Sequence, residues 1–267
     1  MKHRLFVAVW LVASAAPLLA ADRLTDRDVK ELIARIEDGR DKFDNALDDK
    51  FKNSILRDAS GEVNVKRFLN TFQESIDRVE ESLKPDYAAS TEVGTLLRQG
   101  SALERYFRQQ PGGTKGESEW NRLASDLETL AAAYGSDFPI GENPAFRRLG
   151  DREVSQSVKA LESSAQQLKR SLDSDLKKDP SVDKASREGI VDEADQLSKD
   201  AKALRERVND GKPSSAEADQ VLARAARLQT FIKGHQVPAA SGAWHGVASQ
   251  LEIVSAAYRV PSSSRTP

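Results

Sequence analysis

The chain has 267 residues and no cysteine, which excludes disulfide bridges, thiol nucleophiles, covalent haem attachment and a lipid anchor on an N-terminal cysteine. Its 40 basic and 42 acidic side chains are interspersed along the chain, unlike the one-sided basic face of a nucleic-acid-binding protein. We therefore expect no nucleic-acid partner, and a fold that is stable through packing alone.

Residues 1–21 have the three-part layout of a secretory signal peptide. A Lys-His-Arg start is followed by an uncharged run over 5–19, and the first acidic residue comes only after Ala20 and Ala21. An uncleaved anchor is the alternative, but the run is shorter than the ~20 residues that span a bilayer. We expect cleavage after Ala20 or Ala21, and a periplasmic or secreted mature chain with no membrane span.

The segment 22–136 has the alternating spacing of three and four residues that is typical of amphipathic helices. In its last helix, for example, the apolar stripe contains Trp120, Leu123, Leu127, Leu130 and Tyr134. Clusters rich in Gly, Pro, Asp and Ser divide the segment into four parts. The pattern predicts helices at 26–52, 62–84, 91–110 and 117–135.

Residues 137–149 contain Pro139, Gly141 and Pro144 and are the predicted linker. A second helical segment, 150–261, follows, and 262–267 is expected to be a disordered tail. Asp179 before Pro180 resembles an N-cap with proline at the first helical position, and Ser214 precedes Glu217 as in a capping box. The predicted helices lie at 151–177, 181–210, 214–234 and 241–258.

The two helical segments repeat one another. Residues 120–134 and 244–258 share 8 of 15 positions, including the Trp and Tyr that begin and end each segment. Upstream, 26–48 aligns with 151–173 at an offset of 125 residues, and Phe107 is paired with Phe231 at an offset of 124. Such long-range similarity indicates a duplicated structural unit. We therefore predict an all-α fold of two tandem antiparallel four-helix bundles behind the signal peptide.

The repeats differ at several core positions. The first repeat is richer in phenylalanine, so its core should be bulkier, and Arg40 lies on a seam where the second has Ala165. We expect the Arg40 side chain either to extend to solvent at the end of the bundle or to form an ion pair. The alternative is that Arg40 contacts a ligand. The differing pairs are Phe43 and Leu168, Phe51 and Leu176, Phe68 and Glu193, and Phe72 and Leu197.

Signals for chemistry are weak. Four-helix bundles can hold di-iron sites or haem, but no Glu-x-x-His pair occurs and the only Met is Met1. His235 and His245 flank a loop and are the sole metal candidates. Trp120 and Trp244 could contact a partner, although their stripe positions favour the core. We therefore predict no enzyme activity, no cofactor and no metal site beyond this pair of histidines.

The last helix of the first repeat reads W-x-x-L-x-x-D-L-x-x-L-A-x-A-Y over 120–134. With the charged first helix, this motif resembles a family of small exported helical proteins of unassigned function from environmental bacteria. The second repeat departs from it at Gln250, Val254 and Ser255. The resemblance covers both repeats and implies an exported helical module, without an activity or a substrate.

The function expected from these features is a non-enzymatic interaction or scaffold module of the cell envelope, with an unidentified protein or envelope partner. Tandem helical bundles offer extended grooves for such partners. The alternative is a small-ligand, haem or metal carrier that uses the second repeat near His235 and His245. The discriminating observation would be an apolar groove that is exposed on the surface and repeated in both copies.

Overall fold

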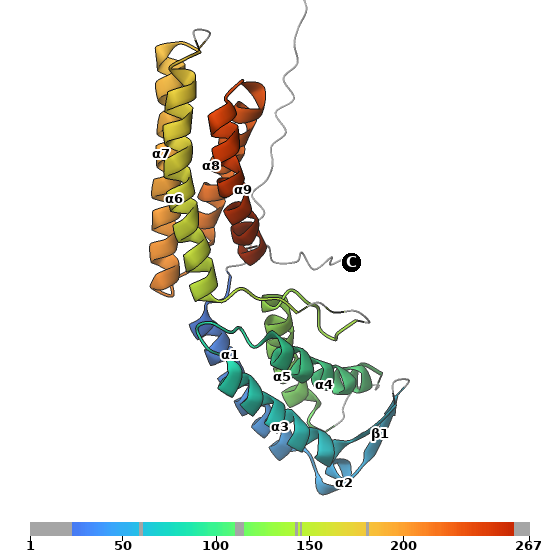
Figure 1. Cartoon of the computed structure of the whole chain (residues 1–267). Helices are drawn as coiled ribbons and strands as arrows, with labels where there is room; N and C mark the ends of the chain where they lie inside the picture. Colours follow the sequence, from blue (N-terminus) through green and yellow to red (C-terminus); the bar gives the residue numbers. More distant parts are fainter. Residues whose placement is uncertain are drawn as a thin grey trace, which may run out of the picture.

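A computed structural model of the protein describes residues 23–58, 61–109, 115–141, 144, 146–179 and 182–258. The predicted signal peptide and the predicted tail at 262–267 lie outside these residues. The described chain is all-α, as expected, with nine helices and one small hairpin. Figure 1 shows the helices in two groups placed end to end. Each group has its own hydrophobic core, the first reaching Phe138 and the second starting at Leu149.

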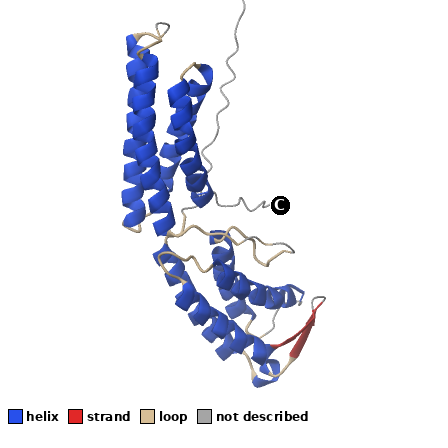
Figure 2. Ribbon diagram, viewed as in Figure 1, coloured by secondary structure: helices blue, strands red, loops and turns tan. Residues whose placement is uncertain are grey.

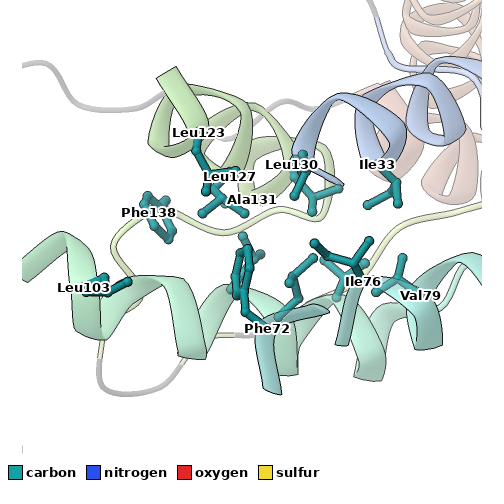
Figure 3. Packing of buried hydrophobic residues seen from close by; sticks show 14 of the residues in the cluster. Ile33, Phe72, Ile76, Val79, Leu103, Leu123, Leu127, Leu130, Ala131 and Phe138 are labelled. Carbon is teal, nitrogen blue, oxygen red and sulfur yellow. The ribbon is translucent and has the colours of Figure 1, made fainter. Parts of the chain in front are cut away.

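The first group encloses the bulkier core. Helix α1 packs against α3 and α5, and α4 closes the ring by packing against the same two helices. Phe43, Phe72 and Trp120 are fully buried at its centre, and Figure 3 shows part of this cluster. The helices are α1 Asp26–Ala46, α2 Asp49–Lys52, α3 Val65–Ser82, α4 Ser90–Gln109 and α5 Glu117–Ala133.

The second group repeats this packing scheme with four helices. Helix α6 packs against α7 and α9, and α8 packs against the same two helices. Its core is built mainly from Leu, Val and Ala, so it contains no aromatic cluster like that of the first group. The helices are α6 Asp151–Leu176, α7 Lys184–Asn209, α8 Ser215–Gly234 and α9 Pro238–Tyr258.

The first predicted helix, 26–52, is interrupted. Helix α1 ends at Ala46, and Asp48 starts the short helix α2 because its side chain accepts a hydrogen bond from the backbone N–H of Phe51. Asp48 therefore acts as an N-cap, a role in which a short acidic side chain competes with helix continuation. The apolar spacing of Phe43, Leu47 and Phe51 concealed this break.

A β-hairpin replaces the loop expected between the first two helices (Figure 2). Strand β1 (Ile55–Asp58) pairs antiparallel with β2 (Gly61–Asn64). The side chain of Asn64 then caps α3 by accepting from the N–H of Arg67, so this helix begins at Val65 rather than at 62. The strands are too short to give a clear alternating pattern, which explains why periodicity did not predict them.

One predicted cap is wrong, and a second is right in position but lacks the predicted hydrogen bond. Helix α7 begins at Lys184, and its N-cap is Asp183, whose side chain accepts from the N–H of Ser186, so Asp179 does not cap it. Ser214 is the N-cap of α8 but makes no capping hydrogen bond. Its hydroxyl instead lies 2.8 Å from the hydroxyl of Tyr258, a tertiary contact that sequence spacing cannot reveal.

The two groups meet where the N-termini of α1 and α6 face each other. The backbone N–H of Asp26 donates to the Asp151 carboxylate (2.8 Å), and the N–H of Asp151 donates to the Asp26 carboxylate (3.0 Å). Each aspartate thus satisfies a free N–H of the opposite helix and places negative charge near the positive end of both helix dipoles.

Two buried arginines complete this junction in the same reciprocal manner. Arg23 binds the carboxylate of Asp151 (2.6 Å) and the carbonyl of Leu149, while Arg148 binds the carboxylate of Asp26 (2.6 Å) and the carbonyl of Leu24. Each guanidinium also lies 6.0 Å from the ring centre of a tyrosine, Tyr258 for Arg23 and Tyr134 for Arg148. The junction, defined by Arg23, Asp26, Arg148 and Asp151, is therefore pseudo-symmetric.

Candidate functional site

An apolar groove lies between α8 and α9 on the second helical group. We call it the α8/α9 groove; its volume is about 590 Å³. Its lining is dominated by small and apolar side chains, with Glu252 as the only ionisable residue. The lining residues are Leu222, Ala225, Ala226, Gln229, Trp244, Ala248, Leu251, Glu252, Ser255 and Ala256.

Helix α9 supplies most of this groove, and many of its apolar side chains are only partly covered. Glu252 is the only charged residue among its 21 residues apart from His245. Nevertheless only four of its residues are buried, and Trp244, Leu251 and Ile253 are half-buried. An apolar helix that is hydrophobic on most sides is normally buried on most sides. The partly exposed apolar face of α9 is therefore a candidate binding surface.

The corresponding groove in the first group, between α4 and α5, is filled in part by the chain itself, and a pocket of about 160 Å³ remains beside Phe138. The filling segment follows α5, and we call its described residues, 136–141, 144 and 146–148, the covering segment. Phe138 is buried against this core, and Ile140 and Phe146 pack against it partly buried. The backbone N–H of Ile140 donates to the Ser101 hydroxyl on α4 (2.9 Å). In Figure 3, Phe138 lies among the core residues near Leu103 and Leu127. Three residues of the predicted linker 137–149, Phe138, Ile140 and Phe146, thus pack against the first core, while Leu149 belongs to the second.

The covering segment accounts for a second buried face on α4. Gly94, Leu97, Ser101 and Glu104 are spaced by three and four residues, and all are buried. The side chains 125 residues further on, in α8, are exposed or half-buried, and three of them line the α8/α9 groove. These positions are Asp219, Leu222, Ala226 and Gln229.

The last helices of the two groups differ in the same way. Trp120 and Leu127 on α5 have no exposed surface, whereas Trp244 and Leu251, 124 residues further on, are half-buried in α9. Both pairs belong to the Trp-to-Tyr stripe that repeats in the sequence. Equivalent side chains are therefore core in one group and groove lining in the other. Trp120 is enclosed by the rings of Phe43, Phe68 and Phe107.

A buried carboxylate holds Trp120 in place. The indole N–H of Trp120 donates to the Glu104 carboxylate (2.8 Å), and Glu104 also pairs with Arg108 one helical turn away. Gln229 occupies the position of Glu104 in the second group. It lines the α8/α9 groove, where its amide can donate to and accept from a bound backbone.

Burial also raises the pKa of the two repeated tyrosines, Tyr134 and Tyr258. Tyr134 donates to the carbonyl of Ala88 (2.6 Å), and loss of solvent raises its pKa to about 12, although nearby Arg148 opposes the shift. Burial likewise raises the pKa of Tyr258, whose hydroxyl contacts Ser214. Both hydroxyls therefore stay protonated near neutral pH and act as structural hydrogen-bond groups.

Arg40 lies on the seam between α1 and α3 and is mostly buried. Its guanidinium pairs with Asp41 (2.8 Å), lies 3.9 Å from Asp44, and donates to the backbone carbonyl of Leu69 (3.2 Å). Its Nε is buried and has no hydrogen-bond partner among the described residues. Ala165 is fully buried at the corresponding place in α6. These contacts tie α1 to α3 at this position.

The two histidines are exposed. The ring of His235 stacks on Phe231 with the ring centres 3.9 Å apart, and its Nδ1 lies 2.8 Å from the Phe231 carbonyl. Nδ1 of His245 lies 3.0 Å from the Ser241 carbonyl. Within the described parts of the chain, no group of three or more His, Cys, Asp or Glu side chains could hold a metal ion. Nor does any helix there have the length and apolar character to cross a membrane.

The structure corrects one pairing between the repeats. Phe107 is buried on α4, and the buried residue at the matching place on α8 is Ile232, 125 residues later, while Phe231 is only half-buried. The identity of the two phenylalanines favoured the wrong offset. The burial pattern of both helices could have shown the offset of 125, since Val93, Leu96 and Leu103 match Ala218, Val221 and Leu228.

Comparison of the chain with protein-family models, with curated proteins and with solved structures finds no match.

Proposed function

We propose that this protein is an exported, non-enzymatic helical interaction module of the cell envelope. In this proposal residues 22–136 and 150–261 are two copies of one antiparallel four-helix bundle behind a cleaved signal peptide. One copy serves mainly as a closed support, and the other offers its open groove to a protein partner. The proposed envelope location rests on the layout of residues 1–21.

Three features support the duplication. The pairwise packing of α1, α3, α4 and α5 is the same as that of α6, α7, α8 and α9. Sequence identity recurs at offsets of 124 and 125 residues. The junction residues show the same offset of 125. Arg23 pairs with Asp151, and Arg148, 125 residues after Arg23, pairs with Asp26. Two unrelated segments would not be expected to share the packing scheme, the sequence identity and the junction contacts.

The main support for the interaction role is the partly exposed apolar face of α9 at the α8/α9 groove. Trp244 and Leu251 line it half-buried, although their counterparts in the first group are completely covered. Apolar grooves rimmed by polar groups mark binding sites in soluble proteins. The partly exposed Trp244 adds to this, since Trp is enriched where partners bind most tightly.

Site-specific photo-crosslinking in cells of the source organism tests this role. A photoreactive amino acid is placed at position 222 or 256, both lining the groove, and in a matched variant at position 223, exposed on α8 outside the lining. We expect discrete adducts with one protein from 222 and 256 and none from 223. Absence of adducts at both groove positions, or identical adducts at 223, would contradict the interaction role.

The export part of the proposal has its own test. The mass of the mature protein from the source cells should correspond to a chain that begins at Ala21 or Asp22. An intact N-terminus starting at Met1 in the purified protein would refute cleavage, whatever the crosslinking shows.

A further inference from the structure

We propose that a polar pocket lined by α1, α2 and α3 binds a small zwitterion, an α-amino acid, with its carboxylate at Lys66 and its ammonium at Asp49. The pocket lies at the end of the first helical group that points away from the second group (Figure 1). The inference goes beyond the proposed interaction function and does not rest on it, because this pocket shares no lining residue with the α8/α9 groove.

The break between α1 and α2 shapes this pocket. Helix α1 ends at Ala46 and the next two residues are extended, so α2 does not continue the axis of α1. Asp44 from α1, Asp49 from α2 and Lys66 from α3 line a space of about 230 Å³. Pockets for drug-sized ligands measure ~300–1,000 Å³, so this space suits a smaller molecule. In the second group, α6 continues to Leu176, past the positions that match most of α2, and has no such break.

The pocket carries unpaired charges of both signs. Asp49, Lys66 and Asn70 line it, and none of these three side chains has a hydrogen-bond or ion-pair partner in the described part of the chain. Asp44, the other acid of the pocket, is bound by Lys52 at 2.7 Å. An unpaired acid and an unpaired base in one pocket are complementary to a ligand that carries both an ammonium and a carboxylate.

At the matching places the second group has an ion pair instead of a polar pocket with free charges. Lys169 on α6 and Asp195 on α7 contact each other at 2.7 Å and join the two helices. The four replacements between the groups are Asp44 by Lys169, Asn70 by Asp195, Asp49 by Ser174 and Lys66 by Val191. The first group therefore keeps charged side chains here that its own fold does not satisfy.

The helices also favour one orientation of the ligand. Lys66 lies in the first turn of α3, where the positive end of the helix dipole favours the carboxylate of the ligand. Asp49 is the free acid for its ammonium. Arg40 is a positioning residue: its guanidinium donates to the Leu69 carbonyl (3.2 Å) and lies 3.9 Å from Asp44, and both of these residues line the pocket.

The test uses L-alanine as the zwitterion, with propionate and ethylamine as probes that each carry only one of its two charges. Binding to the full chain is followed by NMR, through the shifts of backbone amide signals. We expect saturable shifts with L-alanine at residues that line the pocket. Propionate and ethylamine should bind at least about tenfold more weakly, as for loss of a charged hydrogen bond. No saturable shift with L-alanine, or equal binding of either single-charge probe, overturns the proposal.

Three variants assign the two charges, and all three residues are exposed, so the core is left intact. Lys66→Gln should weaken L-alanine binding at least about tenfold and leave it no tighter than ethylamine binding. Asp49→Asn should weaken it equally and leave it no tighter than propionate binding. Lys50→Gln, which removes a lysine of α2 outside the pocket, should change it by less than about twofold. Equal weakening by Lys50→Gln and Lys66→Gln would mean that only the general charge of this surface matters, and would overturn the site.

Discussion

Individual side chains show how the same residue type takes different roles in the two helical groups. Trp120 is fully buried and hydrogen-bonded to Glu104, while Trp244 is half-buried at the α8/α9 groove. The apolar spacing predicted that both tryptophans face inward, and for Trp120 this is what the structure shows. It could not distinguish the two, because Trp120 is enclosed by the rings of Phe43, Phe68 and Phe107, tertiary contacts that the spacing does not show.

The tryptophans lead to a first prediction. Trp120→Ala should lower the free energy of unfolding by about 3–5 kcal/mol, because it leaves a cavity and a buried Glu104 carboxylate without its indole partner. Trp244→Ala is the matched control and should cost clearly less, since its ring is partly solvated in the folded protein. Urea unfolding followed by circular dichroism measures both. Equal costs would mean that the α8/α9 groove is closed in solution.

Tyr134 gives a second prediction, for alkaline pH. The pKa of Tyr134 is raised to about 12 in the folded protein, against about 10 for an unfolded tyrosine. Between these values the folded state holds the proton more strongly, so the stability that burial of the neutral hydroxyl provides is present below pH 10 and declines as the pH rises towards 12. Tyr134→Phe should be less stable than the parent near pH 8 because the bond to Ala88 is lost.

The measurement is the free energy of unfolding of the parent and of Tyr134→Phe at several pH values from 8 to 11. The difference between them should shrink as the pH rises above about 10, since only the parent loses stability through ionisation of this group. A difference that stays constant over the whole range would show that Tyr134 ionises as easily in the folded as in the unfolded chain.

At the scale of elements, apolar periodicity predicted the helices well and their ends poorly. The long stripes of α1, α5, α6 and α9 were found because each has several buried residues at helical spacing. The break at Asp48 and the cap at Asp183 depend on which short polar side chain accepts a hydrogen bond from a free backbone N–H group. Several residues could play that role in each region, and only the folded structure selects one.

The covering segment is the element that sequence reasoning missed most seriously. Its Pro139, Gly141 and Pro144 indicated a linker, and Phe138, Ile140 and Phe146 have no helical or strand periodicity. One signal was present: three large apolar residues are unusual in a solvated loop of this length. Gly94 and Gly100 on α4 were a second signal, because glycine within a helix is unfavourable unless something must approach the backbone closely.

These glycines lead to a third prediction. A Cβ at position 100 would lie 2.8 Å from the Leu127 side chain and 3.3 Å from the Phe138 ring, so Gly100→Ala should destabilise the first group by about 1–3 kcal/mol despite the better helix propensity of alanine. Gly189 in α7 has no atom within 4 Å of such a Cβ. Gly189→Ala should therefore stabilise the protein by about 0.5–1 kcal/mol.

The pair is compared by urea unfolding, with the second group as an internal reference for Gly100→Ala. Release of the covering segment should accompany the loss of stability, so protease cleavage within 136–148 should become faster in Gly100→Ala and remain unchanged in Gly189→Ala. If both substitutions stabilise the protein, the packing of Phe138 against α4 is looser than the structure shows.

For the whole molecule, the repeat predicted equivalent units but not how they touch. The identity of Asp26 and Asp151 was visible in the sequence, together with the Arg that follows each of them. The structure shows that these equivalent aspartates contact each other and that the decisive arginines are Arg23 and Arg148, which lie before them. Identity at a fixed offset records common structure, and a contact between equivalent residues requires in addition a pseudo-two-fold arrangement.

This arrangement leads to the last prediction, which concerns coupling between the groups. Arg148 is almost entirely buried and neutralises Asp26 beside Asp151. Arg148→Ala leaves two carboxylates close together with one fewer cation, at a cost of about 2 kcal/mol after allowing for the partial exposure of Asp26. Arg27→Ala, which breaks only an exposed pair with Glu31, is the control and should cost less than about 0.5 kcal/mol.

The coupling energy is lost as soon as either group unfolds, so the junction protects the less stable group and leaves the more stable one unaffected. Hydrogen exchange during a urea titration, followed by mass spectrometry of peptides from α1 and α6, reports the two groups separately. Arg148→Ala should lower the midpoint of the less stable group alone and widen the gap between the two midpoints, while Arg27→Ala should leave the gap unchanged. An unchanged gap in Arg148→Ala would mean that the junction contributes no net coupling and that the two groups unfold as independent units.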